Sequence, residues 1–97
     1  MAYTKRYRPK LTMPANHSEY DTEWLDGQLS VLTPAYQAKA RNAYSSVYGE
    51  AYQAEEADYK KENAGRNAAN GRLRAFIAAC LTEYNRYRQQ SSGFSGF

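Results

Sequence analysis

The sequence predicts an all-α protein with one short helix and two long helices that form a helical hairpin, an extended basic N-terminal arm and a flexible C-terminal tail. Fifteen alanines and ten tyrosines among 97 residues supply strong helix formers, and rings that can be buried while their hydroxyls reach water. Thr33-Pro34 gives the clearest helix start, because an N-cap residue precedes proline at the first helical position. Two long stretches with a 3.6-residue period follow it.

Residues 1–17 are the predicted arm. Pro9 and Pro14 each bias the preceding residue away from helical geometry, and the stretch shows no hydrophobic period. It contains four bases and no acid. We expect an extended basic segment that precedes a single helical domain at residues 18–90.

The first helix is predicted at residues 18–32. Ser18 with Asp21 three residues later resembles a capping box, and acids in the first turn suit the positive end of a helix. Gly27 weakens the pattern, because Asp26-Gly27 is also a turn signal. The apolar residues that share one side are Trp24, Leu25, Leu29 and Leu32.

A long helix is predicted from residue 34 to about residue 62. One stripe of mostly small residues would let another helix approach closely, and a ladder of tyrosines lies beside it. The ladder is either core or interface, since tyrosine is frequent at binding hot spots. The small-residue stripe comprises Tyr36, Ala40, Ala43, Val47, Ala51 and Ala54, and the tyrosine ladder comprises Tyr44, Tyr48, Tyr52 and Tyr59.

The last helix is predicted from about residue 66 to residue 89, after a turn at Asn63-Ala64-Gly65. Gly71 weakens its beginning, so one bent helix over residues 34–89 is the alternative to a hairpin. Residues 91–97, rich in Ser and Gly, predict the flexible tail. The apolar arc of the last helix contains Ala69, Leu73, Phe76, Ile77, Cys80, Leu81, Tyr84 and Tyr87, of which Leu73, Phe76, Ile77 and Cys80 are expected in the core.

The composition predicts a thin core. Leu, Ile, Val and Phe together number 12 of 97 residues, below the roughly 20% under which chains tend to be disordered. A net charge of only +3 and the helical spacing of Ala and Tyr argue against disorder. We therefore expect a domain stabilised by a partner or by self-association. No apolar segment reaches the ~18 residues of a membrane span, and a lone Cys80 fits a reducing compartment such as the cytoplasm.

Catalytic chemistry is not expected. One His and one Cys are too few for a His/Cys metal cluster and give little basis for a nucleophile–base pair. No glycine-rich phosphate loop follows a strand. The acids Glu55, Glu56, Asp58 and Glu62 alternate with Lys60 and Lys61, which indicates a solvated helix face. We expect no enzyme activity, no cofactor and no metal.

The features that point to function are aromatic and basic. Basic and aromatic residues in the arm suit phosphate contact and base stacking. Arginines flank the last apolar arc, where they either dock on a partner or pair with acids of the first helix. The candidate nucleic-acid contacts are Lys5, Arg6, Tyr7, Arg8 and Lys10. The candidate partner-binding residues are Tyr44, Tyr48, Tyr52, Tyr59, Arg72, Arg74, Arg86 and Arg88.

The stretch from Trp24 through the tyrosine ladder to KKENAGRNAANGRLR at residues 60–74 resembles small helical accessory proteins from the recombination regions of temperate phages. That group includes anti-RecBCD proteins, which bind the host helicase–nuclease and modify its activity. The resemblance implies a non-catalytic phage protein in the host cytoplasm that acts as a host nuclease inhibitor during DNA recombination. It assigns no role to an individual residue.

The leading hypothesis is a protein-binding module that docks on a host protein complex, a RecBCD-type helicase–nuclease. Ten acids among the charged residues favour protein docking over direct DNA binding. One alternative is a nucleic-acid-binding protein that uses the arm and the last helix. The other is a structural homo-oligomer whose thin core is completed by self-association.

Overall fold

The computed structural model describes the backbone of residues 11–95 and the side chains of residues 11–87. This part of the chain is helical and contains no strand. Its elements are the 3-10 turn η2 (Glu19–Asp21), α1 (Thr22–Leu29), α2 (Pro34–Ala54), the 3-10 turn η3 (Asp58–Lys60) and α3 (Lys61–Ser95). The predicted fold class, a short first helix followed by two long ones, is confirmed.

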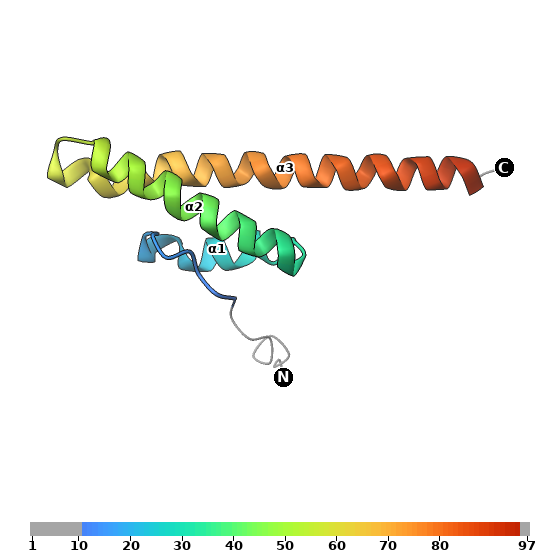
Figure 1. The fold of residues 1–97 in the computed structure, drawn as a ribbon, viewed down its shortest axis with the longest axis horizontal. Coiled ribbons are helices and arrows are strands. Elements are labelled where there is room, and N and C mark those ends of the chain that lie inside the picture. The colour runs from blue at the N-terminus through green and yellow to red at the C-terminus, as the bar shows by residue number, and fades with distance from the viewer. Residues whose placement is uncertain (1–10, 96–97) are drawn as a thin grey trace.

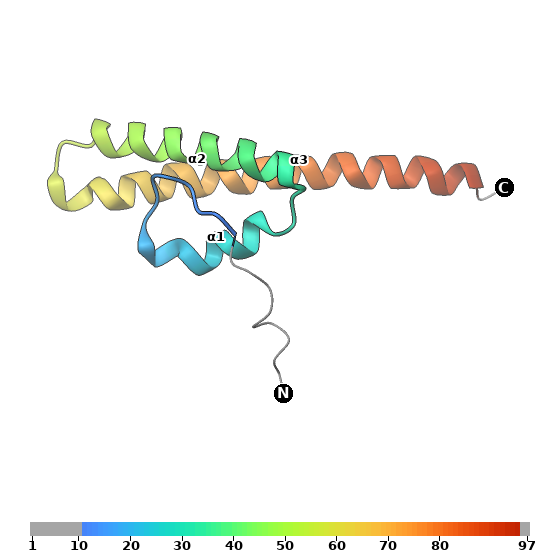
Figure 2. The same ribbon diagram turned by 60° about the horizontal axis from the view of Figure 1, so that its bottom comes forward.

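The two long helices form a hairpin, and α1 lies against one side of it (Figures 1 and 2). α3 is the longer partner and continues well beyond the point where α2 begins (Figure 2). One bent helix over residues 34–89 is therefore excluded. No helix in the described residues is long and apolar enough to cross a membrane.

The turn of the hairpin lies at residues 55–57, and its prediction at Asn63-Ala64-Gly65 was wrong. Glu55 and Ala57 adopt extended backbone with ψ angles of 128° and 118°. Gly65 lies inside α3, where it is buried and lets the ring of Tyr48 approach the backbone. In the sequence, a glycine that is needed for close packing between helices cannot be distinguished from a glycine that ends a helix.

The helix boundaries shift accordingly. α2 ends at Ala54 rather than near residue 62, and α3 begins at Lys61 rather than near residue 66. α3 continues to Ser95, past the boundary predicted near residue 89 and through most of the predicted tail. Residues 96–97 and the predicted arm up to residue 10 lie outside the described residues.

Side chains cap the starts of α2 and η2. Thr33 Oγ1 accepts a hydrogen bond of 3.3 Å from the Tyr36 amide, as the Thr33-Pro34 signal predicts. Ser18 Oγ accepts from the Tyr20 amide at 3.2 Å and donates to a Glu62 carboxylate oxygen at 2.5 Å. The Ser18 contact fastens the start of η2 to the first turn of α3.

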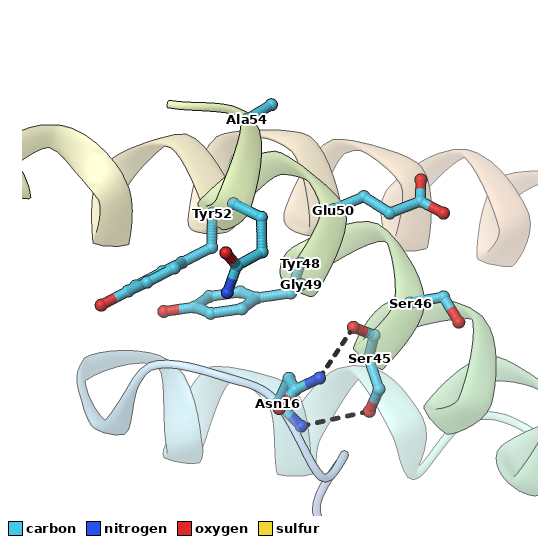
Figure 3. Close-up of a pocket in the computed structure, with 9 residues that line it drawn as sticks. Asn16, Ser45, Ser46, Tyr48, Gly49, Glu50, Tyr52 and Ala54 are labelled. Carbon is cyan, nitrogen blue, oxygen red and sulfur yellow. Dashed lines mark hydrogen bonds between the residues drawn. The ribbon is translucent and has the colours of Figure 1, made fainter. Parts of the chain in front are cut away.

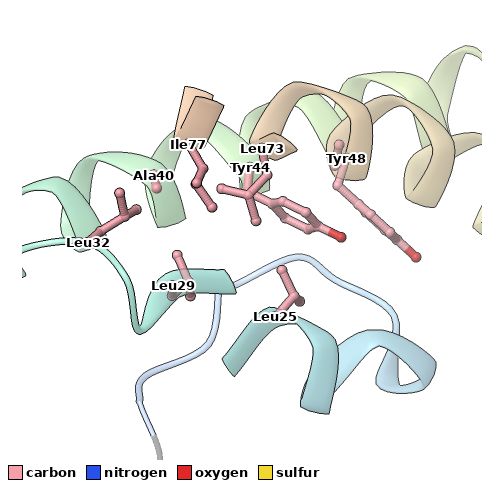
Figure 4. Packing of buried hydrophobic residues seen from close by; sticks show 9 residues of the cluster. Leu25, Leu29, Leu32, Ala40, Tyr44, Tyr48, Leu73 and Ile77 are labelled. Atoms are coloured by element: carbon pink, nitrogen blue, oxygen red, sulfur yellow. The ribbon is translucent and has the colours of Figure 1, made fainter. Parts of the chain in front are cut away.

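The core lies where the three helices meet (Figure 4). Leu25 and Leu29 of α1 are fully buried, and Leu73 and Ile77 of α3 are buried as predicted. Phe76 and Cys80, expected in the core as well, are only half-buried at its edge. The full set of buried apolar residues is Leu25, Leu29, Leu32, Ala40, Tyr44, Tyr48, Ala69, Leu73 and Ile77.

Candidate functional site

The tyrosine ladder exists but is divided between core and surface. The rings of Tyr44 and Tyr48 stack with centroids 6.3 Å apart, and those of Tyr48 and Tyr52 at 6.1 Å. Tyr44 and Tyr48 are 2% and 7% exposed, so they serve the core and are not available for docking. Tyr52 is the exposed end of this stack of rings. Tyr59 lies on η3, apart from the other three tyrosines, and its ring is exposed.

A polar network closes the core beside Tyr44. Asp21 accepts hydrogen bonds from Arg66 Nε at 2.9 Å and Nη2 at 3.0 Å, and from Asn70 Nδ2 at 3.1 Å. The Tyr44 hydroxyl donates to Asn70 Oδ1 at 2.5 Å. The hydrogen bonds from Arg66 hold the pKa of Asp21 below its usual value, while burial raises the pKa of Tyr44. Each buried polar group is satisfied, so this network supports the fold.

The arginines of α3 differ in their surroundings. Arg66 forms an ion pair with Asp21. Pairing with an acid from the predicted first helix was one of the two expectations for the arginines of the last helix. Arg74 stacks over the ring of Trp24 with its guanidinium carbon 5.0 Å from the centroid. Arg86 lies 3.6 Å from Glu83 on the same helix face.

The side chain of Arg88 and the candidate nucleic-acid contacts Lys5, Arg6, Tyr7, Arg8 and Lys10 lie outside the described residues. Of the predicted partner-binding set, the structure places Arg72, Arg74, Arg86, Tyr52 and Tyr59 on the surface.

The most prominent surface feature is the end of α3 that projects beyond the other helices, residues 81–95, which we term the projecting segment (Figures 1 and 2). Its residues Leu81, Tyr84 and Tyr87 continue the line of Leu73 and Ile77 along one helix face. They are 46%, 58% and 68% exposed. The face of α3 that packs on the core is thus exposed to solvent beyond the point where α1 and α2 end.

A polar groove follows the outer side of α2 next to the segment that precedes α1 (Figure 3). Its volume is about 900 Å³, and Asn16 fixes one wall through hydrogen bonds of 3.2 Å to the hydroxyl and the carbonyl of Ser45. Tyr48, Tyr52 and Glu50 also line it. Sequence reasoning missed this groove, because Asn16 and Ser45 are 29 residues apart and share no motif.

A smaller cavity of about 310 Å³, which we term the alanine groove, opens between α2 and α3. No residue of α1 lines it. It is lined by Lys39, Ala40, Ala43, Tyr44, Arg72, Leu73, Ala75 and Phe76. The small-residue stripe in the sequence indicated close packing here, but it did not indicate the pair of bases at the rim.

No group of three or more His, Cys, Asp or Glu side chains in the described part of the chain is placed to hold a metal ion. Cys80 is a half-buried thiol on α3. His17 Nδ1 lies 2.8 Å from the Pro14 carbonyl oxygen, in the segment that precedes η2. The surface of α3 in this part of the chain carries exposed tyrosine rings and arginines.

Comparison of the chain with protein-family models, with curated proteins and with solved structures finds no match.

Proposed function

We propose that this protein is a non-catalytic binding module that docks on another protein through the projecting segment of α3. The observation that carries the proposal is the exposure of Leu81, Tyr84 and Tyr87 along one face of a helix whose core-facing line they extend. Large apolar side chains gathered on one surface are typical of interaction sites. Tyrosine and arginine are also the residues that most often dominate binding energy.

The charges around this surface favour a protein partner. Within the projecting segment Arg86 lies 3.6 Å from Glu83, and nearer the core Arg74 stacks on Trp24. A DNA-binding surface at this segment would be expected to present unpaired bases without an adjacent acid. For the partner we propose a host DNA-processing enzyme of the RecBCD helicase–nuclease type, on the strength of the sequence resemblance alone.

The proposal is tested with purified RecBCD-type enzyme and labelled protein. Leu81→Glu with Tyr87→Glu places two charges in the docking face, and we expect binding to weaken at least tenfold with helix content unchanged. The control is Ala68→Glu, because Ala68 is exposed on α3 and lies outside the projecting segment. Equal loss in both variants, or no loss in either, would contradict the assignment of the surface.

The nucleic-acid alternative makes a different prediction. A protein that neutralises about four phosphates loses affinity steeply with salt, with a log–log slope near −0.9 per phosphate contact. We expect full-length protein to bind free duplex only weakly, and protein lacking residues 1–10 to retain its protein partner. Submicromolar duplex binding at physiological salt that disappears with this deletion would favour the nucleic-acid function instead.

A further inference from the structure

The alanine groove combines an apolar floor with a basic rim. Ala40, Tyr44 and Leu73 are buried beneath it, while Lys39 and Arg72 are exposed at its rim. Neither base forms an ion pair with any described residue, and no acid lines the groove. A complementary ligand would place an aromatic or apolar side chain in the groove and carboxylates at its rim.

The hairpin turn of the same chain has this complementary chemistry. Tyr59 is 83% exposed at the turn, and Glu56 and Asp58 just before it are exposed as well. Lys60 Nζ lies 5.7 Å from the centre of the Tyr59 ring, so the turn also carries one exposed base beside the ring. The exposed acids Glu56 and Asp58 outnumber this base, and the turn thus presents an aromatic ring with an excess of negative charge around it.

The turn and the groove of one chain cannot reach each other. Tyr59 precedes Leu73 by 14 positions, which corresponds to about 20 Å along the rigid α3 helix. An occupant with the chemistry of the turn must therefore come from a second molecule.

We propose that the protein forms a two-fold symmetric dimer in which the hairpin turn of each copy docks in the alanine groove of the other. Each copy has one turn and one groove at separate points of the same hairpin. When the two hairpins lie antiparallel, the turn of each copy meets the groove of the other at the same time. Both turns and both grooves are then occupied, as a closed two-fold interface requires. Tyr59 fills the groove, and Glu56 and Asp58 pair with Lys39 and Arg72.

The surface between the two sites carries mostly small side chains. On the groove side of α2, helical spacing places Ala43, Val47, Glu50 and Ala54 in a row from the groove towards the turn. Ala43 and Ala54 are small and Val47 is half-buried, so the exposed Glu50 is the one large side chain of this row that the partner has to accommodate. The dimer also covers apolar surface that the thin core of one chain leaves exposed, and it leaves the projecting segment available for another partner.

Exchange of charges between groove and turn gives the sharpest test. One variant carries Lys39→Glu with Arg72→Glu, and the other carries Glu56→Lys with Asp58→Lys. All four side chains are exposed, so both variants should fold, which circular dichroism checks. In each homodimer the exchanged site faces a like charge, whereas a mixed pair restores opposite charges at both contacts.

Sedimentation equilibrium measures the mass of each variant and of their mixture. We expect the unmodified chain of 11.1 kDa to show twice this mass as its concentration rises, each charge variant alone to stay monomeric, and their equimolar mixture to regain the dimer mass. A monomeric unmodified chain, or a mixture that stays monomeric, would overturn the proposal. So would a dimer that survives both sets of substitutions.

Tyr59→Ala provides a second, charge-neutral test. Its side chain makes no contact with the core, so the fold should be kept while the dimer dissociation constant rises at least about tenfold, as for an aromatic anchor. Tyr20→Ala, another exposed tyrosine away from both sites, should leave the constant unchanged. Equal effects of the two variants would also overturn the proposal.

Discussion

At the scale of single residues, Asp21 joins η2 to α3 through three hydrogen bonds. It is 7% exposed and joins η2 to Arg66 and Asn70 of α3, and through Asn70 to Tyr44 of α2. A buried carboxylate is stable only when it is paired and hydrogen-bonded. Asp21 therefore fixes the position of α1 against the hairpin as well as compensating its own burial.

Asp21→Asn should make stability less dependent on acid pH. Because Arg66 holds the pKa of folded Asp21 below that of the unfolded chain, the carboxylate stabilises the fold above pH ~3.9. This contribution is lost as the pH falls through the lower folded pKa. In urea melts we expect Asp21→Asn to cost roughly 2–3 kcal/mol at pH 7, through loss of charge-assisted hydrogen bonds, and distinctly less at pH 3. An equal cost at both values would contradict the role of the ion pair.

Gly65 and Gly71 provide a matched pair of substitutions in the same helix. A Cβ at Gly65 would lie 2.9 Å from two ring carbons of Tyr48, whose ring is stacked between Tyr44 and Tyr52. A Cβ at Gly71 would meet nothing within 4 Å. We expect Gly65→Ala to destabilise by about 1–2 kcal/mol, since overpacking outweighs the helix propensity of alanine, and Gly71→Ala to stabilise by about 0.5–1 kcal/mol. Thermal melts that give both changes the same sign would show that the Tyr48 ring can move away.

At the scale of elements, α3 is one helix with two environments. Up to about Cys80 its inner face packs on α1 and α2, and beyond this point Leu81 and Tyr87 are exposed. Helices of ~12–15 residues are marginal in water without tertiary packing. The projecting segment therefore depends on its continuity with the packed part of the helix, or on a partner.

Hydrogen exchange should resolve these two environments. For the free protein we expect the amides of residues 66–77 to exchange close to the rate set by global unfolding, and those of residues 83–87 to exchange at least tenfold faster. Bound partner should slow the second group selectively. Uniform protection along α3 in the free monomer would contradict the view that the projecting segment lacks tertiary support.

At the scale of the whole molecule, the shape is elongated and the core is small. The radius of gyration is 16.8 Å, against about 12–13 Å for a compact domain of this length. Among the described residues, nine apolar side chains are buried, and two of them are alanines. Such a molecule has little apolar burial to offset its conformational entropy, so association should contribute visibly to its stability.

The melting temperature should accordingly depend on protein concentration. Dimer formation stabilises the folded chain by mass action, so we expect the melting temperature to rise by several degrees over a hundredfold increase in concentration. The variant Lys39→Glu with Arg72→Glu should show no rise. A melting temperature that is high and independent of concentration in the unmodified chain would show that the thin core suffices alone.

Part of the structure follows from the sequence because it depends on local interactions. The cap at Thr33, the helical class and the burial of Leu25, Leu29, Leu73 and Ile77 follow from capping chemistry and from a period of 3.6 residues. The spacing of Tyr44, Tyr48 and Tyr52 likewise ensures that their rings stack on one face of α2. Each of these features needs only residues within a few turns of one another.

Tertiary structure decided the rest, because it depends on residues far apart in the chain. The ring of Tyr48 needs a glycine opposite it, which keeps Gly65 inside α3 and leaves the turn to residues 55–57. Whether Arg66 faced a partner or Asp21 depended on where α1 packs. The alanine groove and the exposed core-facing line of the projecting segment arise from the register of α2 against α3, a relation between two helices that neither helical pattern contains by itself.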